Sequence, residues 1–131
     1  MRHQLREFER VFKALADKQR LRILGLLSQG PLVVNDIKSV LKLSMSTVSQ
    51  HLSILRGAGL IIDSKKGRWV EYSITEEVTS SYSIVGSVFP HIDQYFKNEP
   101  QMQSDLAELD KLEKADYDRP TMAHRKPEVS S

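Results

Sequence analysis

Short hydroxyl and amide side chains gather in one stretch of the chain, LSMSTVSQHLSILRGAGL, which runs from Leu43 to Leu60. Side chains of this kind approach the edges of DNA bases closely, and a glutamine can pair with adenine through two hydrogen bonds. The alternative is an ordinary serine-rich helix that faces solvent. From this stretch we expect DNA contacts by Ser46, Thr47, Ser49, Gln50 and His51, with helix packing as the alternative role for His51.

The same stretch has the pattern of a short helix with one buried face. Ser44 or Ser46 can cap its start, because a serine hydroxyl accepts a hydrogen bond from a free amide of the first turn. Val48, Leu52 and Leu55 recur at i, i+4 and i+7 and form a narrow apolar stripe. The two glycines that follow are expected to end the helix. Other elements must then hold this helix by its apolar side.

Three helices are expected before it. The first covers residues 4–15, and Asp17 caps a second one over 18–29. Arg20 and Arg22 on the second helix are expected to be solvated or to form internal ion pairs, with phosphate contact as the alternative. The third helix, 33–42, has no capping hydroxyl at its start. With the helix of 44–57 it forms a helix-turn-helix arrangement.

A hairpin is expected after the glycines, because the apolar period changes from 3.6 to 2. Residues 60–62 and 69–74 read as strands, and 63–68 connect them with a positive-φ position at the glycine. Cations cluster at the tip, where they can reach a phosphate backbone or a minor groove. A solubilising strand edge is the alternative. The residues concerned are Lys65, Lys66 and Arg68.

A heptad-like apolar ladder over 76–97 either covers the chain's own core or meets a partner. We expect self-association, with the first helix packed alongside. Pro90 interrupts the ladder, so a kink or break is expected near Gly86. The predicted dimer interface consists of Leu5, Phe8, Phe12, Val78, Tyr82, Val85, Phe89 and Ile92.

The charge distribution supports a division of the chain. Residues 1–75 contain 13 Lys and Arg against 6 Asp and Glu, whereas 76–131 contain 6 against 11. A basic front half is typical of a polyanion-binding face. We expect a DNA-binding and dimerisation domain over 1–97. A short acidic helix over 98–115 would dock on the dimer or stay frayed, and 116–131 are expected to be disordered.

Composition excludes several classes of protein. The 131 residues include no cysteine, which removes disulfides and thiolate metal sites. No apolar run approaches the roughly 20 residues of a membrane span, and the first ten residues lack a signal-peptide core, so a cytoplasmic protein is expected. We find no phosphate loop and no nucleophile–base pair, and we expect no enzyme activity and no cofactor.

Three runs together resemble the ArsR/SmtB family of bacterial winged-helix repressors: FKALADKQRLRILGLL, VNDIKSVLKLSMSTVSQHLSILRGAGLI and KKGRWVEYSI. The resemblance covers about residues 8–97. It implies a mainly α-helical winged helix-turn-helix fold with a small β-hairpin, in which four helices, two strands and a further helix follow one another. It also implies a recognition helix at 44–57, a wing at 63–68, and a homodimer that binds operator DNA.

The sensor sites implied by the resemblance are absent. Arsenic-responsive members carry two cysteines where Val33 and Asn35 lie in the matching run, and zinc-responsive members carry ligands where this chain has Glu76, Val78, Phe89 and Ile92. We therefore expect no metal site. A small-molecule effector, a protein effector and constitutive binding all remain open. The alternative function is a winged-helix module that binds protein without binding DNA, and the nearest alternative fold is that of MarR-type regulators.

Overall fold

The computed structural model describes residues 4–80 and 83–115. Within these ranges helices dominate, and a small antiparallel sheet takes one strand from before the third helix and two from between the fourth and fifth helices. The elements are α1 (Gln4–Leu15), α2 (Lys18–Leu27), β1 (Leu32–Val33), α3 (Val34–Leu41), α4 (Met45–Gly57), β2 (Ile61–Lys66), β3 (Trp69–Ile74), α5 (Glu76–Thr79), α6 (Ile84–Asn98) and α7 (Pro100–Lys114).

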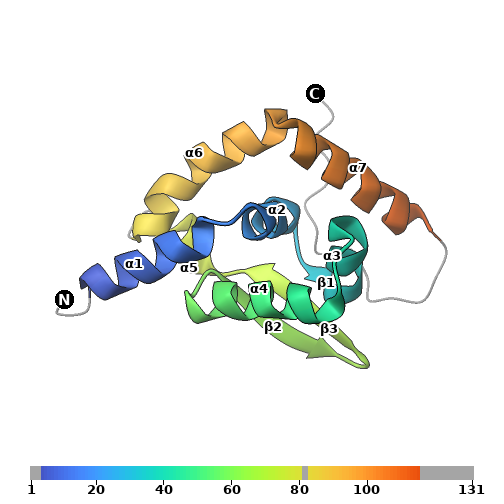
Figure 1. Cartoon of the computed structure of the whole chain (residues 1–131), viewed down its shortest axis with the longest axis horizontal. Helices are drawn as coiled ribbons and strands as arrows, with labels where there is room; N and C mark the ends of the chain where they lie inside the picture. Colours follow the sequence, from blue (N-terminus) through green and yellow to red (C-terminus); the bar gives the residue numbers. More distant parts are fainter. Residues whose placement is uncertain (1–3, 81–82, 116–131) are drawn as a thin grey trace.

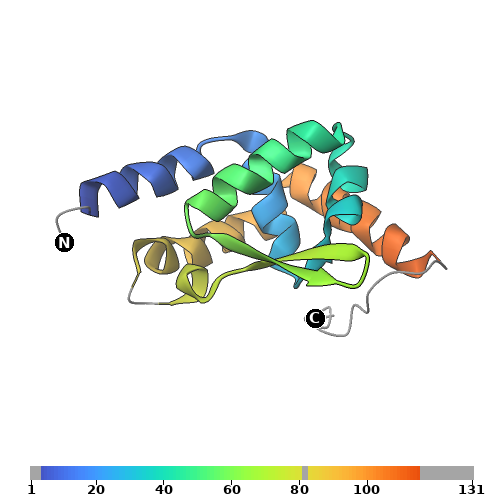
Figure 2. The same cartoon turned by 90° about the horizontal axis from the view of Figure 1, so that it is seen from below.

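Helix α2 lies at the centre of the molecule. Figure 1 shows α6 and α7 as an arch over one side of α2, with α4 and the β2–β3 hairpin on the opposite side. Figure 2, seen from below, places α4 and the hairpin together on that lower face. The predicted winged helix-turn-helix is confirmed in this arrangement, because the helical pair α3–α4 is followed directly by the hairpin.

The predicted caps and apolar faces explain why the central helices form. The Asp17 carboxylate accepts hydrogen bonds from the backbone amides of Gln19 (2.8 Å) and Arg20 (3.1 Å), so it satisfies two free donors at the start of α2. The stripe predicted on α4 is buried, with Val48, Leu52 and Leu55 at most 1% exposed. These side chains join α2 and α3 in one core.

A short strand explains how α3 begins without a capping side chain. Val33 makes no side-chain cap bond. Instead, Leu32 and Val33 pair with Tyr72 and Glu71 of β3, which gives a three-stranded sheet of order β1-β3-β2. The sequence analysis missed β1 because two residues are too few to show a period. Pairing with β3 fixes the backbone at the entry to α3.

The hairpin is longer than predicted. Strand β2 continues to Lys66, which pairs with Trp69, so residues 63–66 are strand and not loop. The turn consists of Gly67 and Arg68 alone, and Gly67 has φ +63°, as two-residue hairpin loops with a leading glycine require. The wing is therefore a stiff ribbon with its cations near the tip.

The predicted ladder over 76–97 is not one helix. Helix α5 ends at Thr79, and Ser83 starts α6 by accepting a hydrogen bond from the Gly86 amide at 2.9 Å. The helix then continues through Pro90, so it does not break near Gly86, and a kink there stays a prediction. The chain breaks before α6 because a serine cap opens a new helix there.

Helix α7 packs into the same core as the winged helix, and the predicted division of the chain at residue 97 stays a prediction. Met102 and Leu109 of α7 are 3% and 1% exposed and lie in the cluster that also contains α2 and α3. Burial of these side chains fixes α7 on its own chain. Residues 116–131 lie outside the described residues.

Candidate nucleic-acid interface

Helix α4 begins at a serine cap that also orders its first turn. The backbone amide of Thr47 donates to Ser44 Oγ at 3.2 Å, and the Ser44 hydroxyl donates to Thr47 Oγ1 at 2.9 Å. Ser44 is thus the cap, which decides between the two serines considered. The Thr47 hydroxyl is engaged in this cap, and the exposed Ser46 hydroxyl also lies 3.3 Å from Ser44 Oγ.

The exposed face of α4 carries the uncharged polar residues predicted to contact DNA. Ser46, Ser49 and Gln50 are exposed, and Thr47 is half-buried. Ser53 is exposed as well, and the sequence analysis missed it. Its spacing from Ser46 and Ser49, at i+7 and i+4, would have placed it on the same helix face. The hydrogen-bonding groups on this face suit the major groove.

His51 packs against α2. Its side chain is 14% exposed, and Nδ1 lies 3.2 Å from Nη1 of Arg20 and 4.0 Å from Oδ1 of Asp17. Arginine has no acceptor, so Nδ1 must accept this hydrogen bond and the ring proton of neutral His51 lies on Nε2. The alternative role for His51, helix packing, is the one that the structure supports, and a direct DNA contact is not.

Arg20 joins three helices through this contact. Its Nε donates to the carbonyl of Ala14 at 2.8 Å and Nη2 donates to the carbonyl of Lys13 at 3.1 Å, both at the end of α1. Partial burial opposes ionisation of Asp17, but the amides of Arg20 and Gln19, the charge of Arg20 and the charge that His51 carries when protonated outweigh it and lower the Asp17 pKa. This Asp17–Arg20–His51 cluster therefore holds α4 against α2.

The wing presents its cations to solvent on the α4 side of the molecule. Lys65, Lys66 and Arg68 are all exposed, and the Arg68 guanidinium lies 5.5 Å from the centre of the Trp69 ring. At the base of the hairpin, Arg56 Nη1 of α4 lies 3.1 Å from Asp63 Oδ2 of β2. This ion pair connects the recognition helix to the wing and so restrains their relative position.

A further cation lies in the turn between α3 and α4. Lys42 has φ 58° and ψ 41°, and it is the one non-glycine residue with positive φ in the ranges 4–80 and 83–115. Glycine is the usual residue in this left-handed position. The sequence analysis missed this feature because a lysine gives no signal for a left-handed turn.

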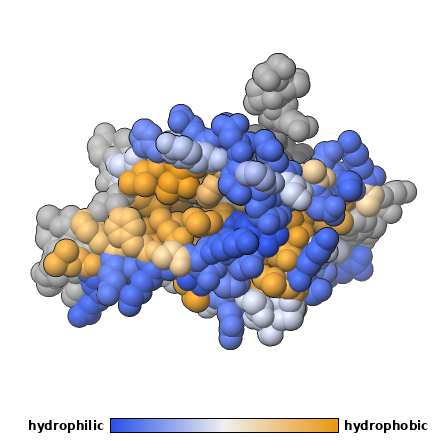
Figure 3. Space-filling model, turned by 45° about the horizontal axis from the view of Figure 1, so that its top comes forward, coloured by the Kyte–Doolittle hydropathy of each residue, from blue (hydrophilic) through white to orange (hydrophobic). Residues whose placement is uncertain are grey.

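An exposed apolar surface covers α1 and α6, on the side away from the wing (Figure 3). On α1, Leu5 and Phe12 are 82% and 50% exposed, and on α6, Val88 and Tyr95 are 39% and 79% exposed. We call these four residues and the half-buried Phe8 and Ile92 the α1–α6 surface.

The predicted dimer interface overlaps this surface only in part. Val78, Val85 and Phe89 are at most 6% exposed and belong to the chain's own core, and Tyr82 lies outside the described residues. The outward stripe of α6 consists of Val88, Ile92 and Tyr95, spaced 4 and 3 apart. The predicted ladder selected the inward stripe because both stripes have helical spacing and periodicity does not say which one meets the core.

No group of three or more His, Asp or Glu side chains that could hold a metal ion occurs in the described part of the chain. None of the helices described there has the length and apolar character that crossing a bilayer requires.

The chain is similar in sequence to one family of known proteins. Residues 17–63 match the family model of bacterial regulatory proteins of the arsR family. The arsenical resistance operon repressor of Bacillus subtilis is 42% identical over 74 residues, which cover 56% of this chain and 70% of that protein. The chain belongs to the ArsR family. The segment matched by the family model runs from the α2 cap through α4 and includes the whole Asp17–Arg20–His51 cluster.

Other ArsR-type relatives match over different lengths. The arsenical resistance operon repressor of Escherichia coli is 44% identical over 69 residues, and the match spans 59% of that protein. The chain thus spans less than two thirds of this curated relative. The homodimeric winged helix-turn-helix DNA-binding domain of Mb0332 from Mycobacterium bovis has a TM-score of 0.59 at 29% identity, over 74% of this chain and 88% of that one.

Proposed function

We propose that this ArsR-family chain is a transcriptional repressor that binds operator DNA as a homodimer. The observation that carries the proposal is the shared face of α4 and the wing. Helix α4, which carries exposed serines and a glutamine, lies on the same side of the molecule as the β2–β3 hairpin, which carries exposed cations. A DNA duplex offers base edges in its groove and phosphates beside it, which matches this pairing of groups.

The α1–α6 surface supplies the second half of the proposal. Its apolar side chains lie on α1 and α6, at the opposite end of the molecule from the tip of the wing, so a second copy can cover them while both recognition helices remain free. The Mb0332 domain, which is homodimeric, supports this assembly. In a twofold dimer the two α4 helices would enter successive major grooves roughly 34 Å apart on a palindromic operator.

Each exposed group then has a role. Gln50 and Ser49 read base edges, and Ser46 contacts the backbone beside them. Lys65, Lys66 and Arg68 contact phosphates or the minor groove. We place the protein in the cytoplasm, where the operator is, and assign it no catalytic role.

The first experiment selects fragments of genomic DNA with the purified full chain and then measures binding to the enriched operator. The Q50A variant should reduce discrimination between operator variants by about 1–3 kcal/mol for the base that Gln50 reads. The K66Q variant should weaken all duplexes alike and lower the slope of log affinity against log salt by about one.

The matched control is K111Q, which removes the same charge from α7, where Lys111 lies exposed and away from α4 and the wing. It should leave the salt slope unchanged. A purified chain that sediments as a single subunit and binds no duplex at low salt would contradict the proposal. A chain that dimerises but binds no duplex would favour the protein-interaction module.

A further inference from the structure

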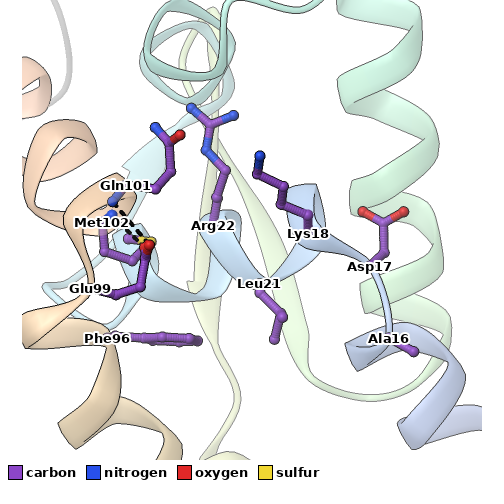
Figure 4. Close-up of a pocket in the computed structure, with 9 residues that line it drawn as sticks. All are labelled: Ala16, Asp17, Lys18, Leu21, Arg22, Phe96, Glu99, Gln101 and Met102. Atoms are coloured by element: carbon purple, nitrogen blue, oxygen red, sulfur yellow. Dashed lines mark hydrogen bonds between the residues drawn. The ribbon is translucent and has the colours of Figure 1, made fainter.

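A pocket of about 430 Å³ opens between the start of α2 and the junction of α6 with α7 (Figure 4). Leu21 and Phe96 reach toward one another from opposite sides, and Met102 lies on the α7 side. Pockets of about 300–1,000 Å³ with mainly apolar walls hold small organic ligands. The space lies on a different face from the exposed side of α4, so the DNA contacts proposed above do not use it.

The charged groups around this pocket are engaged, with one exception. Glu99 caps α7 by accepting hydrogen bonds from the Gln101 and Met102 amides at 3.1 and 3.0 Å. Arg22 is held by Asp105, and Asp17 is held by the first amides of α2. Lys18 is exposed and has no ion-pair or hydrogen-bond partner in the part of the chain that the structure describes. The pocket therefore combines an apolar wall with one available positive charge.

We propose that this pocket binds a small organic acid with an apolar body and a single negative charge. The apolar body lies against Leu21, Phe96 and Met102, and the carboxylate pairs with the Lys18 ammonium. The Lys18 ammonium favours an acid, because a carboxylate gains an ion pair there that a neutral molecule does not make and that a cation would replace by repulsion. A polyanion would meet the engaged carboxylates of Asp17 and Glu99.

The pocket is connected to the recognition helix through one of its own walls. Asp17 lines the pocket and also belongs to the cluster with Arg20 and His51 that holds α4 against α2. Lys18 is the next residue in the chain. A ligand that draws Lys18 toward the pocket therefore shifts the start of α2 and with it the contact with His51. This regulatory part, in which the acid lowers operator affinity, rests on the proposed function.

Ligand binding is tested first without DNA. The full chain is labelled with carbon-13 at the methionine methyl groups, and the Met102 signal is assigned from the M102L variant. Phenylbutyrate should move the Met102 signal saturably, and phenylbutanol, its neutral counterpart, should bind about two- to fivefold more weakly, as expected for one exposed ion pair. K18Q should weaken phenylbutyrate by the same factor and leave phenylbutanol unaffected, while K111Q should change neither.

Two results of this titration overturn the proposal. One is a Met102 signal that neither compound moves, which would show that the pocket binds neither ligand. The other is equal affinity for the acid and the alcohol, or an acid affinity that K18Q leaves unchanged. Either would show that the pocket does not prefer an anion.

The connection to DNA is then measured by fluorescence anisotropy on the selected operator. Saturating phenylbutyrate should weaken operator binding several-fold in the unsubstituted chain. The H51A variant should still show the Met102 shift but lose the effect of the acid on DNA. Operator binding that is insensitive to the acid overturns the regulatory part. If no duplex binds at all, the proposed function fails while the Met102 titration still decides the ligand site, so the two failures are distinguishable.

Discussion

Arg22 of α2 and Asp105 of α7 form a two-point ion pair, although they lie 83 residues apart in the chain. Nε lies 2.8 Å from Oδ2, and Nη2 lies 2.9 Å from Oδ1. The side chains are 12% and 3% exposed. Gln19 and Gln101 complete the arrangement, because Arg22 Nη1 donates to the Gln19 side-chain oxygen at 2.7 Å and Gln101 Nε2 donates to Asp105 at 3.0 Å. The hydrogen bonds that Arg22 donates to Asp105 raise the Arg22 pKa despite burial. The pair therefore attaches α7 to the centre of the fold.

Removal of one partner of this pair should destabilise the protein strongly. The D105A variant leaves a buried guanidinium without its carboxylate, which typically costs about 3–5 kcal/mol. Urea unfolding should show this loss. The matched control is D110A, which removes an exposed partner of Lys114 (2.9 Å) and should cost less than about 1 kcal/mol. The R22M/D105L double variant should recover most of the stability. A D105A variant as stable as D110A would show that the pair does not hold α7.

The lowered Asp17 pKa gives a pH dependence of known sign. The unfolded carboxyl has a pKa of about 3.9, and the folded value is lower. The Asp17 carboxylate therefore stabilises the fold above about pH 4, and this contribution disappears as the pH falls through the folded pKa. The D17N variant keeps a capping oxygen but no charge. The stability difference between the two proteins, measured by urea unfolding at several pH values, should be largest near neutrality and shrink in acid. A difference that grows in acid would contradict the assigned pKa.

The left-handed backbone of Lys42 predicts a stabilising substitution. A non-glycine residue in this conformation carries a cost of about 1–2 kcal/mol that glycine does not. The K42G variant should therefore raise the free energy of unfolding by about 1 kcal/mol, less the extra entropy of glycine in the unfolded chain. K38G, one turn earlier inside α3, is the control and should lower it by about 1 kcal/mol. If both substitutions destabilise equally, the turn does not have the backbone conformation described.

The α1–α6 surface predicts which substitutions separate the subunits. F12E and Y95E each place a charge on an exposed apolar side chain of this surface. Burial of an unpaired charge at an interface is costly, so each should raise the dimer dissociation constant by about tenfold or more in sedimentation experiments. I62E is the matched control, because Ile62 is 53% exposed but lies on the hairpin. An I62E variant that dissociates while F12E and Y95E remain dimeric would place the interface on the hairpin.

Local signals in the sequence located most of the elements correctly. The Asp17 cap, the stripe of Val48, Leu52 and Leu55, and the glycine of the wing turn were all predicted and all confirmed, because each depends only on residues within one or two turns. The same reasoning gave the exposed polar face of α4. It did not predict the burial of His51, since a histidine at the edge of an apolar helical stripe can either pack against the core or face solvent.

The helix-turn-helix, the hairpin and the outward side of α4 follow from the order of residues, because caps, turns and apolar spacing act between neighbours. Three features depend on packing between distant segments: which stripe of α6 is buried, where α7 docks, and the contacts of Arg20 and Arg22 with His51 and Asp105. These outcomes depend on partners that are 31 and 83 residues away in the chain, and spacing within one helix contains no information about them. Burial in a shared core favours the stripe that fits the other helices, and desolvation favours charged groups that find a partner inside that core.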